Sequence, residues 1–231
     1  KEVQQALTDE VIAEGMRTWP EPAYETHGAE IERKLRRRRE DLLDRAEAYY
    51  SELNRQIDVL GSEEDDEILI SFQKKGRVRL AIRRSKDPQN ARFFDRVFVP
   101  GETKEIRLYA LAGDDRLRIS GEPHKRIRIR FVAGAGQDEV ASGDGIALRA
   151  KAIRLYDQPD GATIEAEAKV KDRRSNSPYK NQYDRYDPHN EPFTVAFVPK
   201  LAFNPDDGLA LGGTVVGTFT GFKRSPFASR H

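Results

Sequence analysis

The 231 residues include 40 Lys and Arg against 39 Asp and Glu, which leaves a formal net charge of +1. Such a balance argues against a protein that binds nucleic acid through bulk charge. Cysteine is absent, which excludes disulfides, a thiolate nucleophile and cysteine-ligated zinc. The length allows one large domain or two small ones. No apolar run approaches the ~20 residues of a transmembrane helix.

Residues 1–61 have the pattern of a helical hairpin. Thr8 or Asp9 could cap a short first helix, and Pro20 and Pro22 would end it and form a stiff connector. A second helix is expected from about Ala29 to Gln56, because apolar residues recur there at helical spacing. They are Ile31, Leu35, Leu42, Ala46, Tyr49 and Leu53.

Four consecutive arginines, residues 36–39, fall in the middle of this second helix. One interpretation is a solvated face that is balanced by nearby carboxylates. The other is a contact with anionic head groups or with a partner protein. Residues 57–61 are expected to close the helical part.

Residues 62–170 change to short runs in which apolar residues alternate with polar ones, the pattern of half-buried strands. Runs that begin at Ile106, Ile127 and Ile153 are each followed by a Gly/Asp turn and a second short strand. This is an internal repeat of strand, turn and strand with a period near 23 residues. The repeat indicates stacked rungs, as in a short β-solenoid or β-roll, and an antiparallel β-sandwich is the alternative.

Residues 171–192 are linker-like and polar, with tyrosines that could anchor them to another surface. Residues 193–231 then carry two strands of about ten residues around a turn at 204–208. One face is apolar and the other holds mainly small or polar residues, which fits either a membrane-barrel hairpin or a soluble sandwich hairpin. The expected membrane-facing residues are Phe193, Val195, Phe197, Leu201, Phe203, Leu209, Leu211, Val215 and Phe219.

Several stretches carry a resemblance to a known family. The string from Phe203 to Leu209, the Leu-Gly-Gly at 211–213, Gly221-Phe222 and residues 226–231 resemble the first hairpin of the bacterial surface-antigen barrel superfamily, which includes the outer-membrane barrel-assembly insertase. Residues 31–42, 47–50, 103–109 and 113–115 resemble the region between a calcineurin-like metallophosphoesterase domain and such a barrel. The resemblance covers about four-fifths of the chain.

The resemblance implies an α+β piece of a longer outer-membrane polypeptide, with a periplasmic portion in the bacterial cell envelope. It brings no catalytic residue, because the metal motifs of the phosphoesterase have no match in this sequence. Two strands also cannot close a barrel by themselves.

No nucleophile, acid/base or metal motif occurs, so we expect no enzymatic activity and no cofactor in this segment. The Gly/Asp turns are the candidates for a metal site, since Ca²⁺ prefers several oxygen ligands. The candidate calcium ligands are Asp114, Asp115, Asp138 and Asp160. The alternative is that Gly supplies the positive φ of each turn while Asp caps it.

Arginines recur on one face of the repeat strands, at Arg107, Arg128, Arg130 and Arg154. They could form a solvated face that is laddered with carboxylates such as Glu105. They could instead bind lipopolysaccharide phosphates, an anionic glycan or an envelope protein.

The sequence therefore predicts an α+β chain with a helical hairpin (1–61), a β-repeat domain (62–170), a linker (171–192) and a first barrel hairpin (193–231). Its expected role is structural: it would couple an upstream domain to an outer-membrane barrel, contact lipid and offer a docking surface. One alternative is a calcium- or glycan-binding β-roll of a secreted protein. Another is an accessory part of a metallophosphoesterase.

Overall fold

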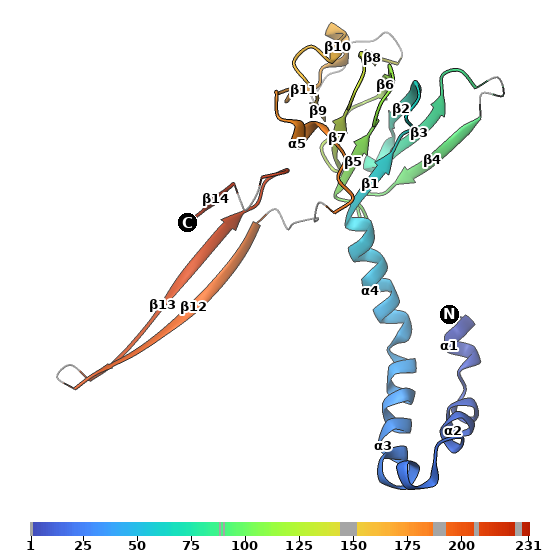
Figure 1. The fold of residues 1–231 in the computed structure, drawn as a ribbon, viewed down its shortest axis with the longest axis vertical. Helices are drawn as coiled ribbons and strands as arrows, with labels where there is room; N and C mark the ends of the chain where they lie inside the picture. The colour runs from blue at the N-terminus through green and yellow to red at the C-terminus, as the bar shows by residue number, and fades with distance from the viewer. Residues whose placement is uncertain are drawn as a thin grey trace. The chain divides into compact units, whose positions relative to one another are not determined.

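The computed structural model (Figure 1) describes residues 2–87, 89, 91–143, 152–186, 193–205, 208–224 and 228–231. The chain divides into two compact units, Lys1–Arg55 and Gln56–His231. The first unit is helical and the second contains three β-sheets, so the α+β class is confirmed. Among the described residues, no helix combines the length and the apolar character that crossing a membrane requires.

The helical unit consists of α1 (Glu2–Ala6), α2 (Asp9–Arg17), α3 (Glu21–Glu40) and α4 (Leu42–Arg55). The expected cap of α2 is confirmed, because the Thr8 hydroxyl accepts a hydrogen bond from the Val11 N–H at 3.3 Å. The expected single helix over 29–56 is wrong. It begins earlier, with Pro22 tolerated in the first turn of α3, and is interrupted at Asp41.

The four arginines at 36–39 have two different environments. Arg39 donates to the Asp9 carboxylate at 2.6 Å and to the Leu7 carbonyl at 3.0 Å. Arg36 pairs with Glu32 on its own helix and lies 3.5 Å from the carboxylate of Asp9. Arg37 and Arg38 are exposed. Half of the run therefore joins the α1–α2 region to α3, and the other half faces solvent.

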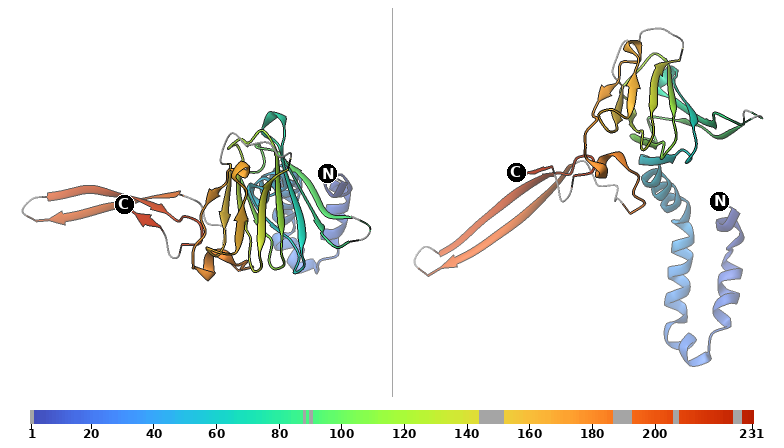
Figure 2. Two further views of the ribbon diagram at one scale, coloured as in Figure 1. Left: turned by 90° about the horizontal axis from the view of Figure 1, so that it is seen from above. Right: turned by 45° about the horizontal axis from the view of Figure 1, so that its top comes forward.

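The second unit holds two large sheets (Figure 2). Sheet A consists of β1 (Gln56–Leu60), β5 (Glu105–Tyr109), β7 (Arg128–Val132), β9 (Ile153–Tyr156) and β11 (Lys171–Asp172), in that order and all parallel. Sheet B has the order β10 (Ala162–Ile164), β8 (Asp138–Ser142), β6 (Arg116–Gly121), β2 (Asp66–Phe72), β3 (Val78–Arg84) and β4 (Arg92–Phe98). Its first four strands are parallel, while β3 and β4 extend it as an antiparallel hairpin.

Each pass of the chain adds one strand to sheet A and then one to sheet B, apart from the β3–β4 hairpin. All the strands expected between 62 and 170 are present, but the limits of the expected segments need correction. Residues 56–60 form β1 of sheet A and do not close the helical part. At the other end, the expected linker 171–192 begins with strand β11.

Branched apolar residues stack in register between the two sheets. In sheet A, Ile106 pairs with Ile129, which pairs in turn with Ile153. These side chains are fully buried, together with Leu117 and Val140 of sheet B. The alternation that was expected to give half-solvated strands instead gives β5 two buried faces.

The turns that lead from sheet A to sheet B also stack on one another. Ala112 and Ala135 form a parallel bridge, and the Gly113 N–H donates to the Ala135 carbonyl at 3.0 Å. Gly136 has φ of 142°, and a Cβ placed there would lie 2.0 Å from the Gly113 carbonyl oxygen. Only glycine allows this approach.

Gly136→Ala is expected to lower the free energy of unfolding by about 2 kcal/mol or more. The added Cβ would clash with the Gly113 carbonyl oxygen, and alanine would be strained at this positive φ. Urea unfolding monitored by circular dichroism measures the change. Gly101→Ala is the matched control, because a Cβ at Gly101 meets nothing within 4 Å. Equal stability of the two variants would contradict the stacked-turn geometry.

After β11 come α5 (Pro178–Asn181) and a third sheet of β12 (Phe193–Asn204), β13 (Gly208–Phe219) and β14 (Ser229–Arg230). All its pairings are antiparallel. The part of the expected linker at 187–192, the turn residues Asp206 and Asp207, and residues 225–227 lie outside the described residues.

Candidate functional site

The β12–β13 hairpin places every expected membrane-facing residue on one face. The register pairs Phe193 with Phe219, Phe197 with Val215, and Leu201 with Leu211. Paired residues of neighbouring strands point to the same side of a sheet, so the odd-numbered positions of both strands share one surface. We call this surface the apolar face: Phe193, Val195, Phe197, Leu201, Phe203, Leu209, Leu211, Val215 and Phe219.

The apolar face is uncovered within the described part of the chain. Its side chains range from 45% exposed at Phe193 to 77% exposed at Leu211. Soluble proteins rarely expose a contiguous apolar surface of this kind unless it binds something. The face is therefore a candidate binding surface.

The opposite face of the hairpin has a different chemistry. Thr194 pairs with Thr218, Val198 with Thr214, and Lys200 with Gly212. These residues are mostly small or polar, so they suit contact with water better than a second apolar core. The two faces thus divide the hairpin into an apolar side and a largely polar side.

Two glycines on the apolar face are covered by aromatic rings from the neighbouring strand. A Cβ at Gly213 would meet the Phe197 ring at 2.4 Å, and a Cβ at Gly217 would meet the Phe193 ring at 3.0 Å. The rings of Phe193 and Phe219 also lie 4.6 Å apart. Phenylalanine over a cross-strand glycine compensates for the side chain that glycine lacks, and it fixes the register of the hairpin.

Beyond β13, the chain returns to the outer surface of sheet A. Phe222 is buried there, with its ring 4.6 Å from the ring of Tyr156. The guanidinium of Arg130 lies 4.4 Å from the Phe222 ring centre, within the range of a cation–π contact. Lys223 follows, donates to the Gln182 carbonyl and lies over the Tyr109 ring at 5.3 Å.

Below Phe222, Glu105 gathers three arginines from β5 and β7. Its carboxylate accepts hydrogen bonds from Arg107 at 3.1 Å, Arg128 at 2.8 Å and Arg130 at 2.8 Å. Arg130 also donates to the Tyr156 hydroxyl. We call these five residues with Phe222 the Glu105 cluster. Burial disfavours the charged form of Glu105, but the hydrogen bonds and charges of the arginines outweigh it and lower the pKa to about 2.

The Glu105 cluster changes the interpretation of the arginine face. Arg107 and Arg130 are each only 6% exposed, so the expectation of an open basic surface is wrong for them. Arg128 is exposed and Arg154 is half-buried. Three of the four, Arg107, Arg128 and Arg130, surround the buried carboxylate of Glu105, and Arg107 and Arg130 also contact Phe222 in the segment that follows the hairpin. Sequence analysis missed Phe222 as their cover.

The candidate calcium ligands have a different role in the described structure. Asp115 accepts the Asp66 N–H at 2.7 Å, and Asp138 accepts the Asp115 N–H at 2.9 Å, so each carboxylate caps the backbone at the start of an earlier strand of sheet B. Asp114 instead accepts the N–H of Gln137, which lies in the next turn along the chain, at 2.9 Å. Asp160 is exposed in its turn. Among the described residues, no three acidic or histidine side chains are arranged to hold a metal ion.

The buried carboxylates have perturbed pKa values. Burial, with the nearby charges of Asp138, Asp66 and Asp65, raises the pKa of Asp115 to about 8. Burial and the charge of Asp157 raise that of Asp138 to about 7. Asp66 and Asp157 complete this column, and sequence analysis missed both. Both had a signal in the sequence: Asp66 begins strand β2, and Asp157 directly follows strand β9.

Because the folded pKa values of Asp115 and Asp138 exceed the unfolded value of 3.8, their protonation stabilises the folded state most at low pH. That contribution should be lost as pH rises from about 4 to about 8. Asp115→Asn retains an acceptor for the Asp66 N–H and cannot ionise, so it should flatten this pH dependence. Thermal unfolding between pH 5 and 8 checks the prediction, and an unchanged slope in the variant would contradict it.

Comparisons with known proteins give no relative. No family model, no curated protein and no solved structure matches the chain. Its function is therefore inferred from the hairpin and the Glu105 cluster.

Proposed function

We propose that this chain is a non-catalytic segment of a bacterial outer-membrane protein and that β12 and β13 are the first strands of a surface-antigen-type barrel. The supporting observation is the uncovered apolar face on a hairpin whose other face is largely small and polar. Barrel strands that span a membrane show this alternation, with lipid on one side and the lumen on the other.

The dimensions of the hairpin agree with this role. Each strand has 12 residues, while a tilted membrane strand needs about 9–11 to cross the hydrocarbon core. A hairpin of a small soluble sheet is usually shorter, with about 5–6 residues per strand.

The edges of the hairpin favour a larger sheet. In the described residues, β12 pairs only with β13, and β14 pairs with the end of β13 as a third, antiparallel strand. Unpaired strand edges are costly in lipid, so the proposal requires further strands to complete the barrel.

The remaining parts would couple the barrel to an upstream domain. We interpret the parallel strands of sheets A and B as a short β-solenoid, in which each rung repeats after about 23 residues. Phe222 and Lys223, soon after β13, are buried against the outer surface of sheet A, which would join barrel and solenoid firmly. The solenoid would then lie in the periplasm and offer a docking surface to envelope proteins.

Flotation of the 231-residue chain with vesicles of phosphatidylethanolamine and phosphatidylglycerol tests the proposal. We expect the chain to float with the vesicles and to stay bound in molar salt, because apolar contact with lipid is not screened by ions. Recovery of the chain outside the vesicle fraction, whether dissolved or aggregated, would contradict the proposal.

A further inference from the structure

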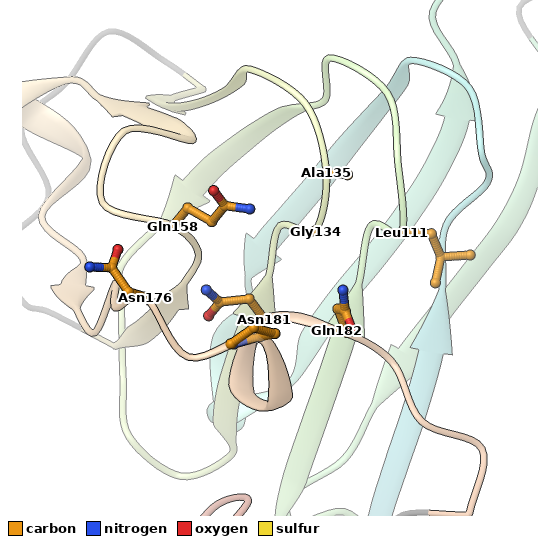
Figure 3. Close-up of a pocket in the computed structure, with 8 residues that line it drawn as sticks. Leu111, Gly134, Ala135, Gln158, Asn176, Asn181 and Gln182 are labelled. Carbon is orange, nitrogen blue, oxygen red and sulfur yellow. The ribbon is translucent and has the colours of Figure 1, made fainter.

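A cavity of about 350 Å³ lies where the turns that follow sheet A meet the segment after β11 (Figure 3). Leu111, Gly134 and Gln158 come from three successive turns, and Asn176, Asn181 and Gln182 come from the other side. This volume is within the range of small-molecule sites. The cavity lies outside the hairpin and the Glu105 cluster, and the proposed function does not use it.

Side-chain amides dominate the polar lining of this cavity. Four of its eight lining residues are Asn or Gln, and no lining residue is charged. Figure 3 shows Gln158, Asn176 and Asn181 around the same opening. Each carboxamide both donates and accepts hydrogen bonds. A cavity of this composition suits an uncharged ligand with many groups that both donate and accept hydrogen bonds.

Asn181 gives the cavity a buried acceptor that lacks a partner. The residue is 3% exposed, and its Nδ2 donates to the Ser175 carbonyl at 2.7 Å. Its Oδ1 is buried and has no hydrogen-bond partner among the described residues. Buried polar atoms are rarely left unsatisfied, so a donor from a ligand would relieve this one.

We propose that this cavity binds one uncharged sugar residue of a glycan. Sugar hydroxyls donate and accept, which matches the carboxamides of Gln158, Asn176 and Asn181. Leu111 and Pro178 provide apolar atoms for the C–H surface of a pyranose ring. An extended peptide is the competing ligand for amide side chains, but it would need a groove, whereas this site is a compact cavity.

Side-chain amide resonances in a ¹⁵N-correlation spectrum of the detergent-solubilised chain report on the site directly. The probes are glucose, N-acetylglucosamine, glucuronate and the capped peptide acetyl-Ala-Ala-Ala-amide. We expect glucose or N-acetylglucosamine to shift the Asn181 and Gln158 amide signals at millimolar concentrations. Glucuronate should bind more weakly, because no cation lines the cavity to pair with its carboxylate.

Gln158→Leu combined with Asn176→Leu removes two amides at exposed positions and should keep the fold. We expect it to weaken sugar binding at least tenfold, while Gln137→Ala, an exposed glutamine outside the cavity, should leave binding unchanged. Absence of shifts with both neutral sugars would overturn the proposal. So would equal binding by the double variant, or shifts with the peptide alone. None of these outcomes bears on membrane binding by the hairpin.

Discussion

Val215→Arg is expected to reduce the vesicle-bound fraction of the chain at least tenfold. Val215 lies near the middle of the hairpin, opposite Phe197, and its side chain belongs to the apolar face. An arginine on the lipid side of a barrel strand costs about 2–4 kcal/mol at the bilayer midplane. Flotation of the variant beside the unaltered chain measures the loss.

Thr214→Arg is the matched control, since Thr214 is the adjacent residue on the opposite face and pairs with Val198. This variant introduces the same charge at nearly the same depth, but on the side that would face water. It should float like the unaltered chain. Equal loss of binding in both variants would show that the two faces are not distinguished by lipid.

Glu105→Gln is expected to lower the free energy of unfolding by about 3–5 kcal/mol, because it leaves buried arginines without their carboxylate. Arg107 and Arg130 would keep their charges in a site closed by Phe222. Urea unfolding measures the change. Glu139→Gln is the control: its ion pair with Arg116 is partly exposed, and such pairs contribute about 0–1 kcal/mol.

The same cluster predicts sensitivity to acid. The folded pKa of Glu105, about 2, is below its ordinary value of 4.5. Its contribution is therefore complete above pH 4.5 and is lost as pH falls towards 2. Thermal unfolding between pH 5 and 2.5 should show a fall that Glu105→Gln lacks. An equal fall of the unfolding temperature in the Glu105→Gln variant would show that groups other than Glu105 cause the acid sensitivity.

The hairpin could be predicted from sequence because its signal is local. Alternation with a period of two residues fixes which side chains share a face of a strand, and the 204–208 turn brings odd positions opposite odd positions. The structure adds what alternation cannot show, namely that Phe197 and Phe193 cover Gly213 and Gly217. That contact depends on diagonal neighbours across the hairpin.

Pairing of the strand arginines with Glu105 was one of the two interpretations of the sequence, but the burial of the Glu105 cluster could not be predicted, since it depends on residues far apart in the chain. Arg130 alternates with apolar residues just as a solvated arginine would, but Glu105, Tyr156 and Phe222, all distant in the chain, bury it. Residues 56–60 were misassigned for a similar reason: β1 is a strand because β5 pairs with it. Strand pairing between residues about fifty positions apart leaves no pattern in the local sequence.

The most direct test of the membrane-hairpin account uses the absence of cysteine from the chain. Single cysteines placed at each position from 209 to 219 can carry an environment-sensitive fluorophore, and vesicles with brominated acyl chains quench only labels in contact with lipid. The account predicts strong quenching at Leu209, Leu211 and Val215, and weak quenching at Ala210 and Thr214. Uniform quenching along β13, or none, would contradict it.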